Sequence, residues 1–249
     1  LVLPPRENAR IMGDGFATRI AADAPMEHLL RLDNFTGCAI DHLALDAAAK
    51  ARVALRVVSG TYARMQELDI ANPLDIAVHC GVEPGGGKSG VECMIENCRL
   101  TGMRQDTPDA PGSRLGLLVG GGWTDGHYNN LIVRGFVDTG VELQAASNIL
   151  HEVHIYRSPC FQFKTALRVR GSQTYMTQCY FDNFVETGVD IQAGNVALQQ
   201  CYFLRWVNAF GPNAEGPAAP GVCIRAVGGE KAVRNLTVIG CSYVNNLKG

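Results

Sequence analysis

Apolar and polar residues alternate in short runs along most of this chain. Each run has the form apolar-x-apolar-x followed by a His, Asn, Gln or Gly residue. The runs occupy residues 38–42, 93–97, 131–135, 174–178, 196–200 and 236–240. A period of two that ends in a turn residue predicts a short β-strand. Helical periodicity is weak and confined to residues 46–55, so the pattern predicts an all-β chain.

A second family of strands follows the first, and both families repeat. Strands of the second family are predicted at residues 139–144, 165–170, 187–192 and 221–226. The tetrapeptide Gln-Cys-Tyr-Phe begins at Gln178 and returns at Gln200, 22 residues later (200 minus 178). Repeats of this length are typical of units that stack on their neighbours, because no unit can bury its apolar face alone.

Two or three short strands in each unit, without helical crossovers, predict a single-stranded right-handed parallel β-helix. We expect about nine coils in one domain that spans residues 1–249. In this register Cys179 stacks on Cys201, and Phe181 stacks on Phe203. The recurrence of Gln-Cys-Tyr-Phe then marks the completion of one coil.

Composition and charge exclude several classes of protein. The formal net charge is −2 with 18% charged residues, and no block of Lys and Arg residues predicts nucleic-acid binding. No run of 18 apolar residues predicts membrane insertion, and no signal peptide is visible. The chain begins without Met, so we expect that N-terminal residues, a cap of the β-helix among them, are missing. The sequence assigns no compartment; a secreted protein or one on a phage or cell surface is compatible with it.

The nine cysteines are an odd number and form no Cys-x-x-Cys pairs. This spacing predicts reduced, buried thiols rather than a disulfide framework or a zinc site. His151 and His154 lie three residues apart in a predicted strand, so their side chains face opposite ways and do not share a metal. We therefore expect neither a metal nor a cofactor.

Nearly the whole chain resembles the pectin-lyase-like β-helix superfamily. The opening stretch LVLPPRENARIMGDGFATRI is similar to the first coil of pectate-lyase-like domains in bacterial glycan enzymes and phage tailspikes. The resemblance implies a right-handed parallel β-helix and a glycan as substrate or receptor. The capping helix that usually begins such domains is absent from this sequence.

The catalytic motifs of two enzyme groups in this superfamily do not carry over. The motifs NTD, DD, GHG and RIK of polygalacturonase-like hydrolases are missing, and the nearest stretch is GHY at 126–128. Pectate lyases carry WIDH and RxPxxR, where this chain has AIDH at 39–42 and RSPCFQ at 157–162, with Gln162 in place of the second Arg. The site must therefore be predicted from the ladder geometry.

One candidate site is a column of charged residues in the second strand family. Alternation turns Glu142, Arg168 and Asp190 outward in one column, and Gln144, Arg170, Gln192 and Arg225 outward in the next. Carboxylates two coils apart can approach the separation used by inverting glycosidases. Glu142 and Asp190 are therefore a candidate acid/base pair, and Arg168 and Arg170 are candidate binders of acidic sugars. The alternative is an ion ladder in which Arg168 only bridges the two carboxylates.

The other candidate site is the stretch GGGWTDGHYNN at 120–130, predicted as a glycine-rich loop. Aromatic rings stack on sugar faces, so Trp123 and Tyr128 are candidate binders, together with His127. Asp125 is a candidate general acid or base. The alternative is that the two rings cover the flank of the coil. We favour this loop over the charged column.

A further candidate substrate-binding residue is Trp206, which precedes a third region, the inserted loop at 210–221. This loop is expected either to wall a glycan-binding groove or to be a solvated loop.

Together these features predict a β-helix that binds polysaccharide along its outer face, as a glycoside hydrolase or polysaccharide lyase. Two other classes remain open: a phage tailspike or other receptor-binding module that grips a glycan without cleaving it, and a structural β-helix. The resemblance to tailspikes implies a homotrimer, for which the column of Tyr180 and Tyr202 is a candidate contact.

Overall fold

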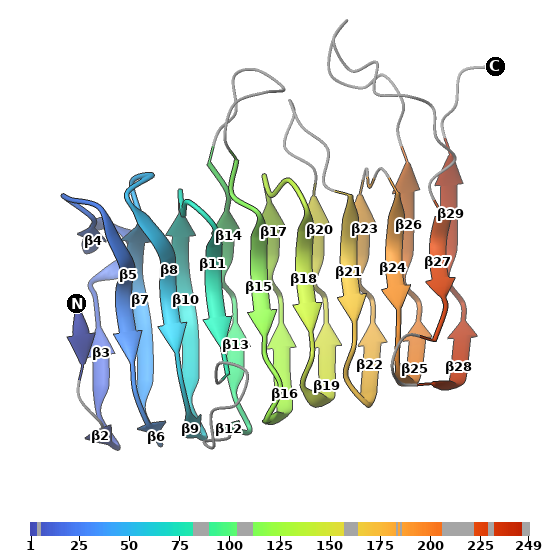
Figure 1. The fold of residues 1–249 in the computed structure, drawn as a ribbon, viewed down its shortest axis with the longest axis horizontal. Coiled ribbons are helices and arrows are strands. Elements are labelled where there is room, and N and C mark those ends of the chain that lie inside the picture. The colour runs from blue at the N-terminus through green and yellow to red at the C-terminus, as the bar shows by residue number, and fades with distance from the viewer. Residues whose placement is uncertain are drawn as a thin grey trace, which may run out of the picture.

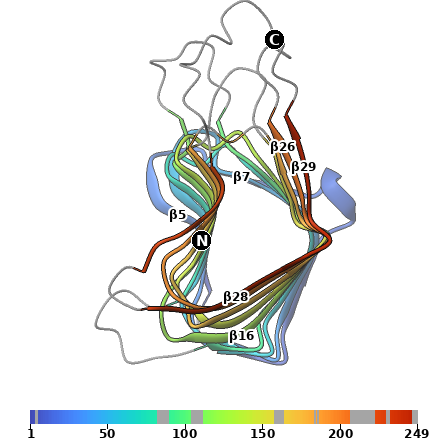
Figure 2. The same ribbon diagram turned by 90° about the vertical axis from the view of Figure 1, so that its right-hand side faces the viewer.

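The structure is a computed structural model, which describes residues 1–3, 6–81, 90–103, 112–156, 164–182, 184, 186–205, 222–228 and 232–245. The strands stack as successive coils along one long axis, from the N-terminus to the C-terminus (Figure 1). Seen down this axis, the strands form the sides of a single tube (Figure 2). Every strand pairing is parallel, as expected when each coil pairs with the next.

The first sheet contains nine strands. The solenoid makes about seven turns, slightly fewer than the nine coils predicted. The strands are β1 (Val2–Leu3), β5 (Met26–Leu32), β8 (Ala51–Val57), β11 (Ile76–Cys80), β15 (Leu115–Val119), β18 (Thr139–Leu143), β21 (Thr165–Val169), β24 (Thr187–Ile191) and β27 (Val222–Ala226).

The second sheet contains 18 strands and bends into two faces. We call them the second and third faces, and the long strands β7 and β10 run through the bend. The short strands β9 (Gly60–Thr61) and β12 (Gly90–Val91) belong to this sheet but precede the second face, beside the start of β16 (Trp123–Asn129). The second face holds β3 (Arg10–Met12), β13 (Met94–Glu96), the rest of β16, β19 (Ala146–His151), β22 (Gln173–Thr177), β25 (Gly194–Gln199), β28 (Val233–Ile239) and the first halves of β7 (Ala39–Asp46) and β10 (Arg64–Ala71). The third face holds their second halves and β4 (Arg19–Ala21), β14 (Arg99–Thr101), β17 (Ile132–Arg134), β20 (His154–Tyr156), β23 (Tyr180–Asp182), β26 (Tyr202–Arg205) and β29 (Ser242–Asn245).

Two small elements complete the described fold. Strands β2 (Arg6–Glu7) and β6 (Phe35–Thr36) form a two-stranded sheet, and one short 3₁₀-helix, η1, spans Gly15–Ala17. No α-helix occurs among the described residues, and therefore none there is long and apolar enough to cross a membrane. The weak helical signal at 46–55 was misleading, because residues 51–55 lie in strand β8.

Left-handed backbone conformations mark two corners of the fold, each over several successive coils. The corner between the second and third faces is a column of residues with φ near +50°: His42, Glu67, Asn97, Asn130, Glu152, Gln178 and Gln200. The corner between the first sheet and the second face is another such column: Asn8, Gly37, Tyr62, Glu92, Asp125 and Ser147. One residue in this conformation turns the chain sharply while the flanking residues stay extended. The turn residues that end several of the predicted runs therefore occupy one structural position.

The interior is filled by columns of like side chains, as the sequence repeat predicts. Phe181 pairs in register with Phe203, and their ring centroids are 5.1 Å apart. Cys179 and Cys201 are both buried one residue before the paired tyrosines Tyr180 and Tyr202. The predicted all-β parallel β-helix and its register are confirmed.

The eight cysteines in the described part of the chain form no disulfide bond; six of them are buried, whereas Cys223 and Cys241 are partly exposed. The ninth, Cys160, lies outside the described residues.

The outer surface of the first sheet carries a column of alternating charge. Backbone hydrogen bonds connect its members coil by coil: Glu27, Arg52, Asp75, Arg114, Asp138, Lys164 and Glu186. Arg52 lies 3.5 Å from Glu27 and 3.3 Å from Asp75, and Arg114 lies 2.7 Å from the same Asp75. Opposite charges on adjacent strands stabilise the register in which they meet, whereas like charges there are destabilising.

Candidate functional site

The predicted column of Glu142, Arg168 and Asp190 exists in the expected register on the first sheet. Arg225 pairs with Asp190 and therefore extends this same column, so its predicted place in the neighbouring column was wrong. The two carboxylates are much less accessible than predicted, because Glu142 is 5% exposed and Asp190 is 1% exposed.

Each carboxylate in this column is neutralised by arginine and bound by glutamine. Arg168 Nη1 lies 3.1 Å from Glu142 Oε2, and Arg168 Nε lies 3.5 Å from Asp190 Oδ2. Arg170 Nη1 contacts Glu142 at 3.1 Å. Gln144 and Gln192 each donate a hydrogen bond of 2.8 Å, to Glu142 and to Asp190 respectively.

The electrostatics around Asp190 favour its ionised form. Burial raises the pKa of Asp190, but hydrogen bonds from Arg225 and Gln192 and the charges of Arg225 and Arg168 outweigh it, so the pKa lies below its ordinary value. A carboxylate held in this way accepts hydrogen bonds and donates no proton near neutral pH. The geometry therefore favours the ion ladder over the acid/base pair.

The predicted AIDH element is bound in a similar polar chain. Arg10 donates hydrogen bonds of 2.7 and 3.0 Å to the carboxylate of Asp41, whose other contact is His42 Nδ1 at 2.8 Å. His42 Nε2 in turn lies 2.8 Å from Glu67 Oε2. The hydrogen bond from Arg10 is the main cause of the lowered pKa of Asp41, which is 3% exposed. This element fixes the corner of the coil.

The stretch at 120–130 is not the predicted loop, because most of it forms strand β16. Trp123 is fully buried and Tyr128 is 1% exposed, so both side chains belong to the core and cannot stack on a glycan. Trp123 packs against Gly90, where an added Cβ would lie 2.3 Å from the indole ring. Their predicted role in substrate binding is therefore wrong, and instead of covering the flank of the coil, as in the alternative, both rings pack in its interior.

Asp125 and His127 lie on the outer surface of the same strand. Asp125 is exposed at the left-handed corner, with φ of 54°, and His127 is half-buried two residues later. The register places Glu92 next to Asp125 in the corner column, and Met94 beside His127 in strand β13. The outward-facing residues of β16 therefore form one continuous surface with those of the preceding coil.

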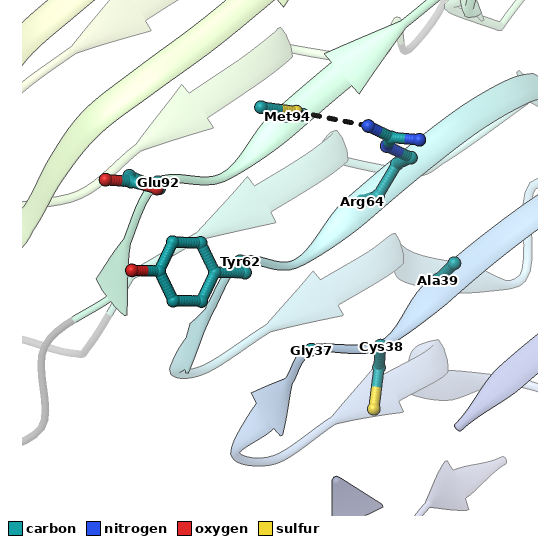
Figure 3. Close-up of a pocket in the computed structure, with 7 residues that line it drawn as sticks. All are labelled: Gly37, Cys38, Ala39, Tyr62, Arg64, Glu92 and Met94. Atoms are coloured by element: carbon teal, nitrogen blue, oxygen red, sulfur yellow. Dashed lines mark hydrogen bonds between the residues drawn. The ribbon is translucent and has the colours of Figure 1, made fainter. Parts of the chain in front are cut away.

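A pocket of about 330 Å³ lies on these preceding coils (Figure 3). Its lining comprises Gly37, Cys38, Ala39, Tyr62, Arg64, Glu92 and Met94. The side chains of Tyr62 and Glu92 point to the same side, whereas Arg64 and Met94 lie on the other side of the pocket (Figure 3). Arg64 Nη2 donates to Met94 Sδ at 3.7 Å, a weak acceptor.

Tyr62 is the most unusual residue of this pocket. Its ring is largely in solvent, because the residue is 62% exposed, and its backbone has a φ of 56°. A bulky residue in the left-handed region is strained, and Gly37 occupies the equivalent position one coil earlier. Strain of this kind persists where the structure or the function requires it.

The charged groups at this corner differ from those of the first sheet. Within the described ranges, Arg64 has no carboxylate partner, and neither Glu92 nor Asp125 forms an ion pair or a side-chain hydrogen bond. We call Tyr62, Arg64, Glu92, Asp125 and His127 the corner site.

The sequence contained a signal for Tyr62 and Glu92 that the strand patterns alone did not bring out. The segments 36–43, 61–68 and 91–98 align without gaps, and this alignment puts Tyr62 and Glu92 at the position of Gly37. The alignment therefore identifies Tyr62 and Glu92 as corner residues. The remaining predicted binder, Trp206, lies outside the described residues, as does the loop at 210–221.

No group of three or more His, Cys, Asp and Glu side chains in the described part of the chain is arranged to hold a metal ion.

Comparison with known proteins gives likenesses of structure only. No family model and no curated protein sequence matches the chain. An endo-xylogalacturonan hydrolase from Aspergillus tubingensis is similar over 94% of this chain and 84% of its own, at 9% identity and a TM-score of 0.43. The catalytic unit of a thermostable GH87 alpha-1,3-glucanase from Streptomyces thermodiastaticus strain HF3-3 is similar at 11% identity and a TM-score of 0.36.

A GH87 alpha-1,3-glucanase catalytic domain in complex with tetrasaccharides is similar at 11% identity and a TM-score of 0.35. This chain covers 60% of the Streptomyces chain and 64% of the tetrasaccharide-bound chain, and 96% and 97% of it are matched. From its own strands and their register, the chain is a parallel β-helix, the fold that its resemblance to the pectin-lyase-like superfamily implies.

Proposed function

We propose that this β-helix protein binds polysaccharide at the corner site and cleaves it with the carboxylates of Glu92 and Asp125. The observation that carries the proposal is the contrast between two groups of charges. Glu142 and Asp190 on the first sheet are buried and paired, whereas Glu92 and Asp125 of the corner site lack ionic partners among the described residues, and Glu92 lines a pocket. An exposed, strained Tyr62 supplies an aromatic face beside them.

The register supports a role for the two carboxylates as a pair. Glu92 and Asp125 occupy the same corner position in adjacent coils, whose backbones are about 4.8 Å apart. Retaining glycosidases use carboxyl groups about 5–5.5 Å apart, and inverting enzymes use a wider separation. One carboxyl group of the pair protonates the leaving oxygen and the other attacks the sugar or stabilises the charge that develops. Arg64 binds sugar oxygens, and His127 is a second proton carrier at the same surface.

A second candidate function is glycan binding without cleavage, as in a tailspike or another receptor-binding module. The exposure of Asp125 favours this candidate, because general acids of glycosidases commonly lie in sites shielded from water. The homotrimer implied by the tailspike resemblance is a separate proposal. Its candidate contact is the partly exposed column of His154, Tyr180 and Tyr202, in which the two tyrosine rings stack at 4.9 Å. The mass in solution tests it.

The deciding experiment is incubation with a panel of neutral and acidic polysaccharides. Hydrolysis is read from new reducing ends, elimination from the ultraviolet absorbance of unsaturated products, and binding from calorimetry. Tyr62→Ala is expected to weaken binding about tenfold or more, which corresponds to about 1.4 kcal/mol. Glu92→Gln and Asp125→Asn are each expected to abolish turnover with little loss of binding.

Phe16→Ala is the matched control, since Phe16 is a comparably exposed aromatic residue at 51% on η1, outside the pocket lining. Binding that Tyr62→Ala weakens, without any turnover, would establish the receptor-binding candidate. Turnover that survives in both carboxylate variants, or affinity for no glycan of the panel, would overturn the corner site.

A further inference from the structure

An apolar column begins at the pocket and continues along the second face. Met94, His127, Ile149, Tyr175 and Ala197 follow one another in register on strands β13, β16, β19, β22 and β25. Ile149 is 39% exposed and Tyr175 is 49% exposed, so two large apolar side chains of this column meet solvent. We call these five residues the apolar ridge.

A polar column runs beside the ridge at every coil. Two residues further along the same strands lie Glu96, Asn129, His151, Thr177 and Gln199, again in register. Asn129 Nδ2 donates to Glu96 Oε1 at 3.1 Å, and His151 Nδ1 and Thr177 Oγ1 are 2.9 Å apart. Amide, imidazole and hydroxyl groups of this kind retain capacity for further hydrogen bonds.

The two columns together match the two chemical sides of a sugar ring. A pyranose has an apolar face of C–H groups, which packs on aliphatic and aromatic side chains, and a rim of hydroxyl groups, which forms hydrogen bonds. The ridge holds no Lys, Arg, Asp or Glu, and the polar column holds only one carboxylate, Glu96. This surface therefore favours a neutral glycan over an acidic one.

The spacing of the columns also fits a repeating ligand. Each coil advances the columns by about 4.8 Å, and an extended pyranose chain advances by a similar length with each ring. Met94 belongs both to the pocket lining and to the ridge, so the two surfaces are continuous.

From these observations we infer that a neutral linear glycan, entering at the corner site, lies along the apolar ridge parallel to the solenoid axis, with Tyr175 as its distal aromatic contact. The inference rests on the proposed function, since it extends the same glycan beyond the pocket. It predicts that affinity rises with the length of the glycan. It also predicts that substitutions in the apolar ridge weaken the binding of long glycans more than that of short ones.

The test measures Kd, or KM where the glycan is cleaved, for a disaccharide and a hexasaccharide of the same linkage. The probes are β-1,4-glucan, β-1,4-xylan, β-1,3-glucan and α-1,3-glucan oligosaccharides, with α-1,4-galacturonan oligosaccharides as the acidic series. Wild type is expected to bind a neutral hexasaccharide at least about tenfold more tightly than the disaccharide. Tyr175→Ala and Ile149→Glu are expected to remove most of that gain and to leave the disaccharide constant unchanged. Circular dichroism checks that each variant is folded, and Phe16→Ala again serves as control.

The outcomes separate this inference from the proposed function. If Tyr62→Ala weakens both ligands and the ridge variants weaken neither, the ridge is overturned while the corner site stands. If the ridge variants weaken the hexasaccharide and Tyr62→Ala has no effect, the corner site is overturned and the ridge stands. Tighter binding of the galacturonan series than of every neutral series would overturn the inferred class of glycan.

Discussion

Arg225 donates two parallel hydrogen bonds to the carboxylate of Asp190, from Nε to Oδ1 at 2.9 Å and from Nη2 to Oδ2 at 2.8 Å. This bidentate geometry is the strongest form of the arginine–carboxylate pair. It joins the last strand of the first sheet to its neighbour, while Arg168 contacts the same carboxylate from the other side. Asp190 thus connects three successive coils.

The first prediction follows from this arrangement. Asp190→Asn leaves Arg168 and Arg225 without their shared countercharge, so it should lower the free energy of unfolding by about 1–3 kcal/mol. Chemical denaturation measures the loss. Gln192→Ala is the control, because it removes one neutral hydrogen bond to the same carboxylate and should cost less. If Asp190→Asn were as stable as wild type but lost glycan turnover, the ladder would be catalytic after all.

Truncation of Phe203 tests the register of the core. Phe203 is 2% exposed, packs on Phe181, and meets Phe184 edge-on at 6.5 Å. Phe203→Ala should cost about 3–5 kcal/mol, and Phe203→Leu, which leaves a smaller cavity, should cost clearly less. Equal stability of the two variants would mean that the ring is not enclosed as the structure has it.

The strain at Tyr62 predicts a trade between stability and binding. Asparagine tolerates the left-handed conformation better than tyrosine, so Tyr62→Asn should raise the free energy of unfolding by up to about 1 kcal/mol while weakening glycan binding. Gln178→Asn is the matched control, since Gln178 has a φ of 53° at the other corner and carries no ring. It should stabilise the protein and leave binding unchanged. A destabilised Tyr62→Asn would show that the ring is held for packing.

His79 predicts a dependence of stability on pH. Burial, followed by the charge of Arg56, lowers the pKa of His79 from 6.5 to about 3. Between these values the unfolded chain binds more protons than the folded chain, so stability falls as the pH drops below about 6.5 towards about 3. One such group contributes at most about 1.4 kcal/mol per pH unit, less here because the side chain is partly exposed. The urea midpoint of wild type should fall between pH 7 and pH 5 by more than the midpoint of His79→Gln does. An equal fall in both proteins would contradict this assignment.

The thiols give a prediction about covalent state. Titration with a thiol reagent after denaturation, without reductant, should find most of the nine cysteines reactive. In the folded protein Cys98 should react slowly, because it is 2% exposed and burial raises its pKa to about 12. Four disulfides in the purified protein would contradict the reduced state.

The fold could be predicted because each coil must bury its apolar side chains against the next coil, so similar residues recur at the same positions. Gln-Cys-Tyr-Phe at 178–181 and at 200–203 marks one corner and one strand start, so its spacing reports the coil length directly. The column of Glu142, Arg168 and Asp190 was found for the same reason, since in-register alternation fixes which residues share a side.

Burial at the site was harder to predict. Alternation says that Glu142 and Asp190 point out of the tube, but not that neighbouring arginines and glutamines cover them. Trp123 was misplaced because its environment depends on Gly90, 33 residues earlier (123 minus 90), which leaves room for the indole. Tyr62 was missed because the strand patterns do not show that segments 36–43 and 61–68 align without gaps, which places Tyr62 at the corner position of Gly37.

The alternating charges of the first sheet have a consequence for how such a chain can change in length. Deleting the coil of Asp75 would bring Arg52 against Arg114, and deleting the coil of Arg168 would bring Glu142 against Asp190. Deleting two adjacent coils keeps every contact between opposite signs. The ladders therefore impose a parity rule, under which internal duplications and deletions of this solenoid are tolerated in pairs of coils and penalised singly.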